Sequence, residues 1–309
     1  MGGVKLFSPA KVNLFLNVLR KRKDGYHELE TLFERIDLKD TITIRRTPRR
    51  IRIQNRGEKV PSDTKHLAYR AAKLLKDTYH VRQGVRITVQ KRIPVSAGLG
   101  GGSSNAATVL LGLNRLWKLG LSRQVLLKLG AKLGSDVPFF ILETPFALAK
   151  GRGELLKKFP APGIKLWHVL VKPPFSISTK TAYRVFDALT PPLRPAKRLF
   201  GGAGLTLPKA GVRMLLHSIQ KGDSGALAKL LTNSLELTLN KRLTEILKIK
   251  KRLLKEGAAG ALLSGSGSCV FGLFSSKAKA VKAARRLRQA HRAWKVFVAS
   301  TYFGEKLPR

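Results

Sequence analysis

Acidic residues and cysteine are scarce in this chain of 309 residues. Eighteen Asp and Glu stand against 60 Lys and Arg, which gives a formal net charge of +42. The single cysteine, Cys269, excludes an internal disulfide and is typical of a protein in a reducing compartment. The six histidines show no metal-ligand spacing, and one cysteine cannot complete a zinc site. We therefore expect neither a disulfide-stabilised secreted domain nor a zinc protein.

The chain also lacks long apolar runs. No segment reaches about 18 consecutive apolar residues, so the sequence predicts no transmembrane helix. The first 28 residues do not have a signal peptide's order of basic start, apolar core and small-residue cleavage site. We therefore expect a cytoplasmic protein without a membrane partner. The length and the 43% hydrophobic composition suit one large or two ordinary domains with sizeable cores.

The excess of positive charge would suit binding to nucleic acid or to an acidic membrane surface. However, the basic residues are spread along the whole chain. Their densest run, residues 275–296, has apolar residues at helical spacing, namely Ala278, Val281, Ala284 and Leu287. Aromatic residues do not alternate with the charges there, as stacking on bases requires. We interpret this run as a solvated amphipathic helix and expect no specific nucleic-acid partner, with nucleic-acid binding as an alternative function.

Hydrophobic periodicity predicts strands and helices in both halves of the chain. In the first half we expect strands at 12–19, 29–38, 40–55, 84–95, 137–142 and 145–159, and helices at 66–79, 103–116 and 122–134. In the second half we expect strands at 166–171, 260–265, 268–274 and 295–300, and helices at 178–189, 211–222, 224–231 and 242–257. The pattern restarts near Pro160, so we expect domains at 1–160 and 161–309. Residues 190–211 are rich in Pro and Gly and are predicted to be a loop. Together these elements predict an α+β protein of two lobes.

Two glycine clusters, one in each half, are candidate binding elements. The first extends from Pro94 to Ser104 and runs into an uncharged helix, and the second is Gly265-Ser266-Gly267. Neither fits a Rossmann fingerprint or a P-loop. Successive glycines nevertheless allow backbone N–H groups to turn toward an anion, and a helix start adds unpaired N–H groups and a positive dipole end. The first cluster therefore favours a phosphate site, with Ser103 and Ser104 as helix caps or as ligands of phosphate and metal. A simple connector between a strand and a helix is the alternative.

Few side chains near these clusters can perform chemistry. Lys11 stands at the start of a strand otherwise suited to burial, and Asp136 lies between a helix end and an apolar run. From sequence alone, Lys11 could equally be an edge lysine that reaches solvent, and Asp136 could be a turn residue. In a chain with so few acids, an aspartate beside an apolar run is also a candidate general base.

Taken together, these segments resemble a known family. The stretches "SPAKVNLFL" (8–16), "PVSAGLGGGSSNAA" (94–107) and "LLSGSGSCVFG" (262–272) resemble the three motifs of the GHMP small-molecule kinase superfamily, in the same order and at similar spacing. The residues "DGYH" (24–27) and "LGSDVPFF" (133–140) narrow the resemblance to the branch that phosphorylates 4-diphosphocytidyl-2-C-methyl-D-erythritol. The resemblance implies two lobes, an N-terminal one like domain 2 of ribosomal protein S5 and a ferredoxin-like C-terminal one.

The resemblance implies a phosphotransferase of the non-mevalonate route to isoprenoid precursors. ATP would donate its γ-phosphate to the 2-hydroxyl of the cytidylylated methylerythritol, and Mg²⁺ would be carried by ATP, with Ser104 as a candidate ligand. By position, Asp136 would be the general base, and Lys11 would orient the alcohol and offset negative charge in the transition state. The expected ATP-binding residues are Pro94, Val95, Ser96, Ala97, Gly98, Leu99, Gly100, Gly101, Gly102, Ser103 and Ser104.

The same resemblance implies how the other substrate is held. The face of Tyr26 would stack on the pyrimidine, and the edge of His27 would form a hydrogen bond to it. The full set of expected substrate-binding residues is Asn13, Tyr26, His27, Thr179, Tyr183, Gly265, Ser266 and Gly267. The chain departs from the resemblance at His66, where we expect an asparagine that helps to hold the adenine.

Two questions stay open at this point. Another GHMP kinase, acting on mevalonate derivatives, homoserine or a sugar, is an alternative, although those acceptors carry no pyrimidine for Tyr26 and His27 to bind. The surface charge exceeds what the reaction requires, although a positive field would attract two anionic substrates. For the assembly, we expect a monomer or a weak homodimer.

Overall fold

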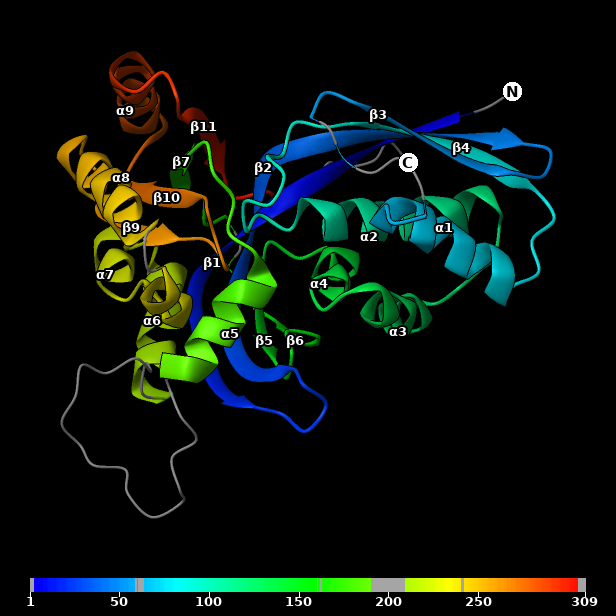
Figure 1. Cartoon of the computed structure of the whole chain (residues 1–309), viewed down its shortest axis with the longest axis horizontal. Coiled ribbons are helices and arrows are strands. Elements are labelled where there is room, and N and C mark those ends of the chain that lie inside the picture. Colours follow the sequence, from blue (N-terminus) through cyan, green and yellow to red (C-terminus); the bar gives the residue numbers. More distant parts are fainter. Residues whose placement is uncertain are drawn as a thin grey trace.

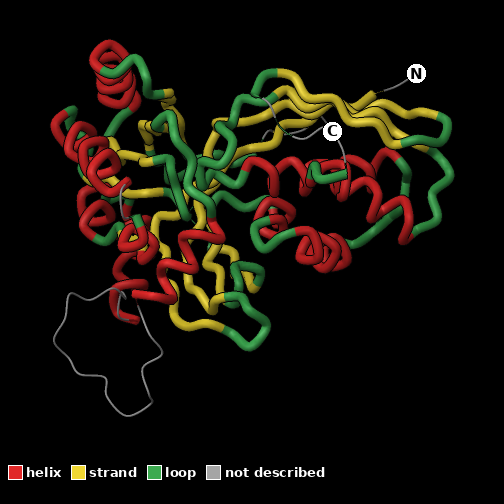
Figure 2. Tube along the Cα trace, viewed as in Figure 1, coloured by secondary structure: helices red, strands yellow, loops and turns green. Residues whose placement is uncertain are grey.

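The computed structural model of the chain describes residues 3–58, 60, 64–159, 161, 163–189, 209–239 and 242–304. The described chain forms two β-sheets with helices packed against both, and in Figure 2 the long strands extend from the centre of the molecule along one edge, with helices on their other side. Most of the predicted loop at 190–211 lies outside the described residues. Among the helices that are described, none is both long enough and apolar enough to span a membrane.

The larger sheet is built on two long antiparallel strands, β1 (Gly3–Lys21) and β2 (His27–Thr47). Its other strands are β3 (Ile51–Arg56), β4 (Gly84–Gln90), β5 (Phe146–Lys150), β6 (Leu155–Lys158) and β8 (Thr232–Asn233). The strand order is β3-β4-β2-β1-β8, and β5 pairs with β2 and β6. Strand β1 is buried continuously over 8–18, which explains its apolar run. The sequence predicted a break near residue 39, but β2 continues through it to Thr47.

Four helices accompany this sheet, and they gather on one side of it in Figure 1. They are α1 (Leu67–Thr78), α2 (Gly101–Leu116), α3 (Arg123–Leu133) and α4 (Val137–Leu142). The prediction of a strand at 137–142 was wrong, because this run is the short helix α4. All six of its side chains are buried, and Pro138 occupies the first turn, where its missing N–H costs no hydrogen bond. A short apolar run has no periodicity that separates a buried strand from a buried helix.

The second sheet belongs to the C-terminal lobe. It consists of β7 (Trp167–Lys172), β9 (Gly260–Leu263), β10 (Val270–Phe274) and β11 (Lys295–Ser300), in the order β11-β7-β10-β9. With α8 (Leu243–Lys255) and α9 (Lys277–Ala290) these strands form the β-α-β-β-α-β succession of a ferredoxin-like lobe. The expected fold class is therefore confirmed. Further helical segments of this lobe are α5 (Thr179–Leu189), α6 (Lys209–Lys221), α7 (Ser224–Lys229) and the 3₁₀ helix η1 (Ser234–Thr238).

Helix α9 confirms the predicted amphipathic helix in the basic run but corrects its apolar stripe. The buried residues are Ala280, Ala283, Ala284 and Leu287. Two of the predicted stripe positions, Ala278 and Val281, are exposed instead. Alanine is small enough to occur on either face of a helix. A pattern made mostly of alanine therefore predicts the helix more reliably than it predicts which side is buried.

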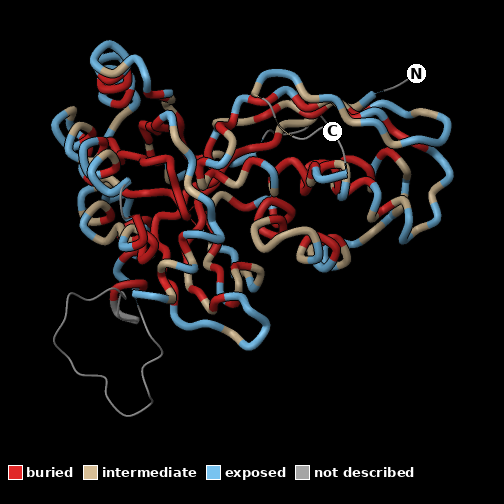
Figure 3. Tube along the Cα trace, in the orientation of Figure 1, coloured by how far each residue is buried: buried red, intermediate tan, exposed pale blue. Residues whose placement is uncertain are grey.

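Each lobe has a hydrophobic cluster of its own, and a further cluster joins the two lobes where buried positions concentrate (Figure 3). Strand β8, from the second half of the chain, pairs in parallel with β1, with Phe15 opposite Thr232 and Leu16 opposite Asn233. A cluster of buried side chains joins Leu14 and Phe146 to Leu170 and Phe271. We propose that the domain boundary remains at residue 160, with β8 as a strand that the second domain contributes to the sheet of the first.

Candidate functional site

A cavity of about 1400 Å³ lies where the two lobes meet. This volume exceeds the roughly 300–1,000 Å³ of a pocket for one small ligand, so two ligands have room side by side. All but one of the residues predicted for the site line it. They are Lys11, Asn13, Tyr26, His27, Pro94, Val95, Ser96, Ala97, Gly98, Leu99, Gly100, Gly101, Gly102, Ser103, Asp136, Thr179, Tyr183, Gly265, Ser266 and Gly267.

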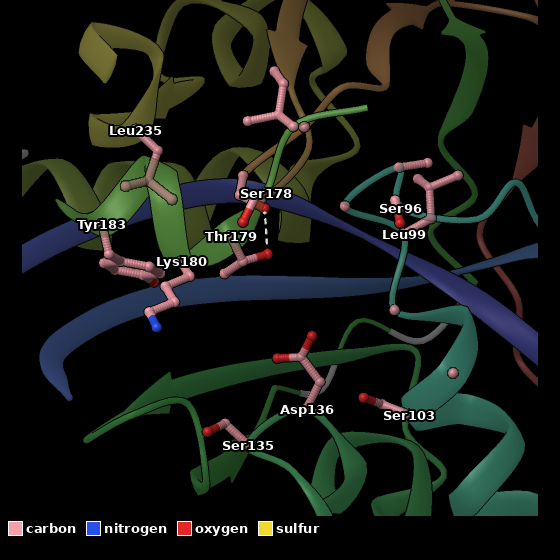
Figure 4. A pocket seen from close by; sticks show the side chains of 18 of the residues that line it. Ser96, Leu99, Ser103, Ser135, Asp136, Ser178, Thr179, Lys180, Tyr183 and Leu235 are labelled. Carbon is pink, nitrogen blue, oxygen red and sulfur yellow. Dashed lines mark hydrogen bonds between the residues drawn. The ribbon is translucent and has the colours of Figure 1, made fainter. Parts of the chain in front are cut away.

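Ser104 is the exception. Its side chain is fully buried, and its hydroxyl accepts a hydrogen bond from the Ser8 hydroxyl at 2.7 Å. Its backbone N–H donates to the Gly100 carbonyl within the helix. The structure therefore does not bring Ser104 to the cavity as a metal or phosphate ligand. Ser103, one position earlier, turns its hydroxyl to the cavity (Figure 4).

The two glycine clusters touch in the structure, although Gly98 and Ser264, the residue before the second cluster, are 166 positions apart in sequence. Ser264 donates its hydroxyl to the Gly98 carbonyl at 3.0 Å. A Cβ atom on Gly98 would lie 1.9 Å from the Ser264 carbonyl oxygen, and Gly98 has a φ of +75°. Only glycine permits both this close approach and this conformation. Each cluster thus fixes the other, a contact that the sequence did not predict.

The first cluster ends in the N-terminus of α2. Gly100 is the N-cap in the left-handed conformation, and no side-chain hydrogen bond caps the helix among the described residues. The first-turn residues Gly101, Gly102 and Ser103 line the cavity. An uncapped helix start with glycines in its first turn offers backbone N–H groups and a positive dipole end to an anion.

A buried network that no sequence motif indicated supports this helix start. Lys91 lines the cavity and forms an ion pair with the fully buried Asp40, with 2.5 Å between Nζ and Oδ2. Asp40 also accepts hydrogen bonds from the backbone N–H groups of Arg92 and Ile93 and from the Asn105 amide. The network holds the segment that leads into the glycine loop. No motif pointed to it, because its members are common residues far apart in sequence.

Lys11 and Asp136 face each other across the middle of the cavity. Lys11 Nζ lies 3.8 Å from Asp136 Oδ2, and it donates to Asn13 Oδ1 at 2.6 Å. Lys11 is almost completely buried, whereas the Asp136 side chain is one-third exposed. Burial lowers the pKa of Lys11, and the charge of Asp136 opposes that shift only in part. The Asn13 amide donates in turn to the Thr31 hydroxyl, so Asn13 is itself held in place and restrains the lysine.

The aspartate is presented to the cavity by α4. Asp136 is the N-cap residue of that helix, yet no capping hydrogen bond of its side chain is found in the described structure. Its carboxylate therefore points away from its own helix and into the cavity, with Ser103 beside it and Thr179 opposite (Figure 4). The Thr179 hydroxyl lies 2.8 Å from the Ser266 hydroxyl, which joins α5 to the second glycine cluster.

The far end of the cavity is formed by aromatic and charged side chains. Tyr26 is half-exposed, and the guanidinium of Arg152 lies over its ring at 4.6 Å. His27 is buried, and its ring stacks on that of Tyr183 with 4.7 Å between centroids. Burial, and to a lesser degree the charge of Asp136, raises the pKa of the Tyr183 phenol. His27 Nε2 lies 2.5 Å from Oδ1 of Asp187, a residue that sequence reasoning did not identify.

His66, the position that departs from the resemblance, also lines the cavity. It is the N-cap of α1, and its Nδ1 accepts a hydrogen bond from the Ala68 N–H at 3.1 Å. This is the capping role that an asparagine side chain also fills well. The replacement therefore keeps the local structure of the helix start.

Comparisons with known proteins agree with this geometry. The chain matches the family "GHMP kinases N terminal domain" over residues 66–144 and "GHMP kinases C terminal" over residues 215–293. The 4-diphosphocytidyl-2-C-methyl-D-erythritol kinase of Geobacillus kaustophilus (strain HTA426) is 42% identical over 283 residues, which is 91% of each chain. That of Pelotomaculum thermopropionicum is 43% identical over 282 residues, 91% of this chain and 92% of the relative.

Solved structures of related kinases are also similar to this chain. The crystal structure of a 4-(cytidine 5'-diphospho)-2C-methyl-D-erythritol kinase superposes with a TM-score of 0.76 at 36% identity, covering 96% of this chain and 98% of that one. A homoserine kinase from Cytophaga hutchinsonii superposes with a TM-score of 0.72 over 98% of this chain and 95% of that one. Its identity is 20%, so this second similarity concerns the fold alone.

Proposed function

The chain belongs to the GHMP kinase family, and on this premise we propose that it transfers the γ-phosphate of ATP to the 2-hydroxyl of 4-diphosphocytidyl-2-C-methyl-D-erythritol. The products are the 2-phosphate and ADP, and the reaction serves the synthesis of isoprenoid precursors. One observation carries the proposal. A single cavity has an anion-binding helix start at one end, a Tyr-His pair at the other, and Lys11 facing Asp136 between them.

Asp136 is proposed as the general base. As the substrate oxygen forms its bond to the γ-phosphorus, the bond from that phosphorus to the β–γ bridging oxygen breaks, and the hydroxyl proton passes to the Asp136 carboxylate. The exposure of this carboxylate to the cavity and its freedom from helix capping support the role. Lys11, buried and held by Asn13, orients the hydroxyl and offsets the negative charge that develops.

The segment from Pro94 to Ser103 is proposed to hold the phosphates of ATP through backbone N–H groups. This assignment is supported by the uncapped start of α2 and by the glycines that line the cavity there. A phosphate chain needs donors and positive charge rather than catalytic side chains, and the start of α2 offers N–H groups and a positive dipole end. Pro94 to Ser103 therefore positions the γ-phosphate, whereas Lys11 and Asp136 act on the hydroxyl.

Mg²⁺ is proposed to enter with ATP. The described residues contain no group of three or more His, Cys, Asp or Glu that could hold a metal. The Ser103 hydroxyl and the Asp136 carboxylate, which lie side by side in the cavity, suit a hard cation that keeps most of its ligands from phosphate and water. When bound, the ion would neutralise charge on the β- and γ-phosphates.

The cytosine is proposed to bind at Tyr26 and His27, with Asn13 contacting the polar part of the substrate. Tyr26 has an exposed ring for stacking, and His27 is buried in a fixed orientation. Thr179, Tyr183 and the turn Gly265–Gly267 complete this side of the cavity. Mevalonate derivatives, homoserine and simple sugars have no base to occupy this end, so the arrangement favours the cytidylylated acceptor over those of other GHMP kinases.

We propose a cytoplasmic enzyme, because ATP is supplied there, and a monomer or weak homodimer. A net charge of +42 makes two copies repel each other, which opposes tight self-association at low salt. The same field attracts ATP and the cytidine diphosphate group, which speeds their encounter with the cavity.

The proposal is tested by incubating the purified protein with ATP, Mg²⁺ and 4-diphosphocytidyl-2-C-methyl-D-erythritol while following ADP release and the mass of the product. We expect one ADP per phosphorylated acceptor and no comparable release with mevalonate, homoserine or galactose. Release with one of those acceptors alone would indicate a different GHMP kinase. RNA binding at nanomolar affinity without any ADP release would support the nucleic-acid alternative.

A further inference from the structure

Three side chains from one turn of α5 contact His27 at the end of the cavity proposed for the base. Tyr183, Phe186 and Asp187 stand at positions i, i+3 and i+4, which places them on one face of the helix. Tyr183 stacks on the His27 ring, and Phe186 meets it edge-on with 6.4 Å between centroids. These contacts fix the plane of the imidazole. Asp187 then fixes one of its nitrogens, with 2.5 Å between Oδ1 and His27 Nε2.

The chemistry of Asp187 determines which nitrogen carries the proton. Partial burial raises the pKa of Asp187, but hydrogen bonds from Lys21 and His27 outweigh it, so the carboxyl is ionised and can only accept. His27 Nε2 must therefore donate. Lys21 Nζ, 2.8 Å from Oδ2, already offsets the carboxylate charge, and the chain as a whole is strongly positive. Lys21 thus holds the carboxylate in place as an acceptor for the N–H at His27 Nε2.

The other ring nitrogen is the one left for a ligand. In a neutral imidazole protonated on Nε2, Nδ1 has a lone pair and no proton, so it accepts a hydrogen bond and cannot donate one. Within the described part of the chain, no protein partner is found for His27 Nδ1, although the residue lines the cavity. A nucleobase that binds at His27 Nδ1 must therefore carry a hydrogen-bond donor at that position. Cytosine has an amino group at position 4, whereas uracil has a carbonyl oxygen there.

We propose that Asp187 is the positioning residue that sets the preference for cytosine over uracil. It holds the proton of His27 on Nε2, and Nδ1 then accepts a hydrogen bond from the 4-amino group and rejects the uracil oxygen. This inference rests on the proposed function, because it assigns the base to this end of the cavity. Asp187 itself acts through His27 rather than on the substrate.

The test compares cytidine- and uridine-diphosphate-linked methylerythritol as acceptors for the wild type and for Asp187→Asn. Lys21 Nζ can only donate, so it keeps the amide oxygen of the asparagine on its own side, and the amide NH₂ then donates to His27 Nε2. The imidazole proton moves to Nδ1, which can now donate a hydrogen bond to the uracil oxygen. We expect the ratio of kcat/KM for the two acceptors to fall by about tenfold or more, mainly through KM, with the KM for ATP unchanged. Asp187→Glu, which retains a carboxylate, should restore part of the preference.

Asp24→Asn is the matched control. Asp24 lies in the turn between β1 and β2, where it accepts a hydrogen bond from the Tyr26 N–H. It makes no hydrogen bond or ion pair with the His27 ring in the described structure. The change removes the same charge and should leave the cytosine preference intact. An unchanged preference in Asp187→Asn, or an equal loss in both variants, would overturn the assignment of specificity to Asp187.

A second measurement separates this inference from the proposed function. Nitrogen-15 NMR of labelled histidine in the free wild-type protein, assigned with His27→Gln, should show Nε2 protonated and Nδ1 unprotonated near neutral pH. Protonation of Nδ1 would overturn the inference even if the enzyme phosphorylates the cytidylyl acceptor. Absence of that activity with the expected tautomer would instead count against the proposed function alone.

Discussion

The two ends of the cavity are built from different materials. At the end proposed for ATP, a run of ten residues from Pro94 to Ser103 supplies mostly glycine, small side chains and a helix start. At the end proposed for the base, side chains come from the β1–β2 turn, from Arg152 and from α5. The difference follows from the ligands. A phosphate chain is bound by any set of N–H groups and positive charge, whereas a base is distinguished by single donors and acceptors.

Because the two ends differ in this way, substitutions in different parts of the cavity should have different effects. Changes at the glycine end should alter the backbone and the binding of ATP. Changes at the base end should alter the binding of the acceptor and leave the backbone in place. Changes at the centre, where Lys11 faces Asp136, should alter the rate of transfer and neither binding constant. Substitutions in each of the three zones can therefore show whether the zones act separately.

The largest effect is expected for Asp136→Asn. Loss of the proposed base should lower kcat by about 10²–10⁴-fold, because an amide of the same shape cannot take the hydroxyl proton. The KM values for both substrates should change little, since the residue lies between the two binding ends. Steady-state assays with each substrate varied would measure this, with Ser135→Ala, a neighbour that also lines the cavity, as the control. Near-normal turnover would remove Asp136 as the base.

The next largest effect is expected for Gly98→Ala. The added Cβ would meet the Ser264 carbonyl oxygen at 1.9 Å, so the loop must move, and its left-handed φ alone costs about 1–3 kcal/mol. We expect the KM for ATP to rise about tenfold or more and the melting temperature to fall, with the KM for the acceptor less affected.

Gly102→Ala provides the comparison for Gly98→Ala. Gly102 is helical, and the nearest atom to its added Cβ is a leucine methyl at 3.4 Å. Alanine there should be neutral or should stabilise the helix by up to about 1 kcal/mol. Thermal unfolding of both variants would show it. Equal losses in the two proteins would mean that the contact between the glycine clusters does not set the shape of the ATP end.

A smaller and more selective effect is expected for Tyr26→Ala. Stacking of a base on an aromatic ring contributes about 1–3 kcal/mol, so the KM for the cytidylyl substrate should rise about tenfold while that for ATP stays within about twofold. Tyr26→Phe should behave like the wild type, because the ring face is retained. If Tyr26→Ala raised both KM values equally, the base would not be held at this end.

The difference between the ATP end and the base end also explains how much of the site could be predicted from the sequence. The motifs of the sequence predicted the fold family correctly. The glycine run is contiguous, and both it and Lys11 line the cavity, while their roles there stay predictions. The sequence did not predict which serine lines the cavity, because Ser103 and Ser104 differ only in their direction around a helix. Asp187 lies 160 residues from His27, and no local pattern relates them. Helix α4 was mistaken for a strand because six apolar residues carry no period.

The smallest predicted effect concerns the pH dependence of turnover and tests whether the centre is independent of both ends. Burial lowers the pKa of Lys11, so its ammonium loses its charge at a lower pH than an ordinary lysine. If the charged form offsets negative charge in the transition state as proposed, kcat should fall on the alkaline side below pH 10.5, while the KM values change less. Lys11→Arg, whose guanidinium stays charged, should lose this alkaline decline even if its maximal rate is lower. In Tyr26→Ala the decline should keep its position, because the ring at the base end does not touch Lys11. A shift of the decline in that variant would show that occupancy of the base end controls the charge at the centre, and the two zones would then have to be treated as one.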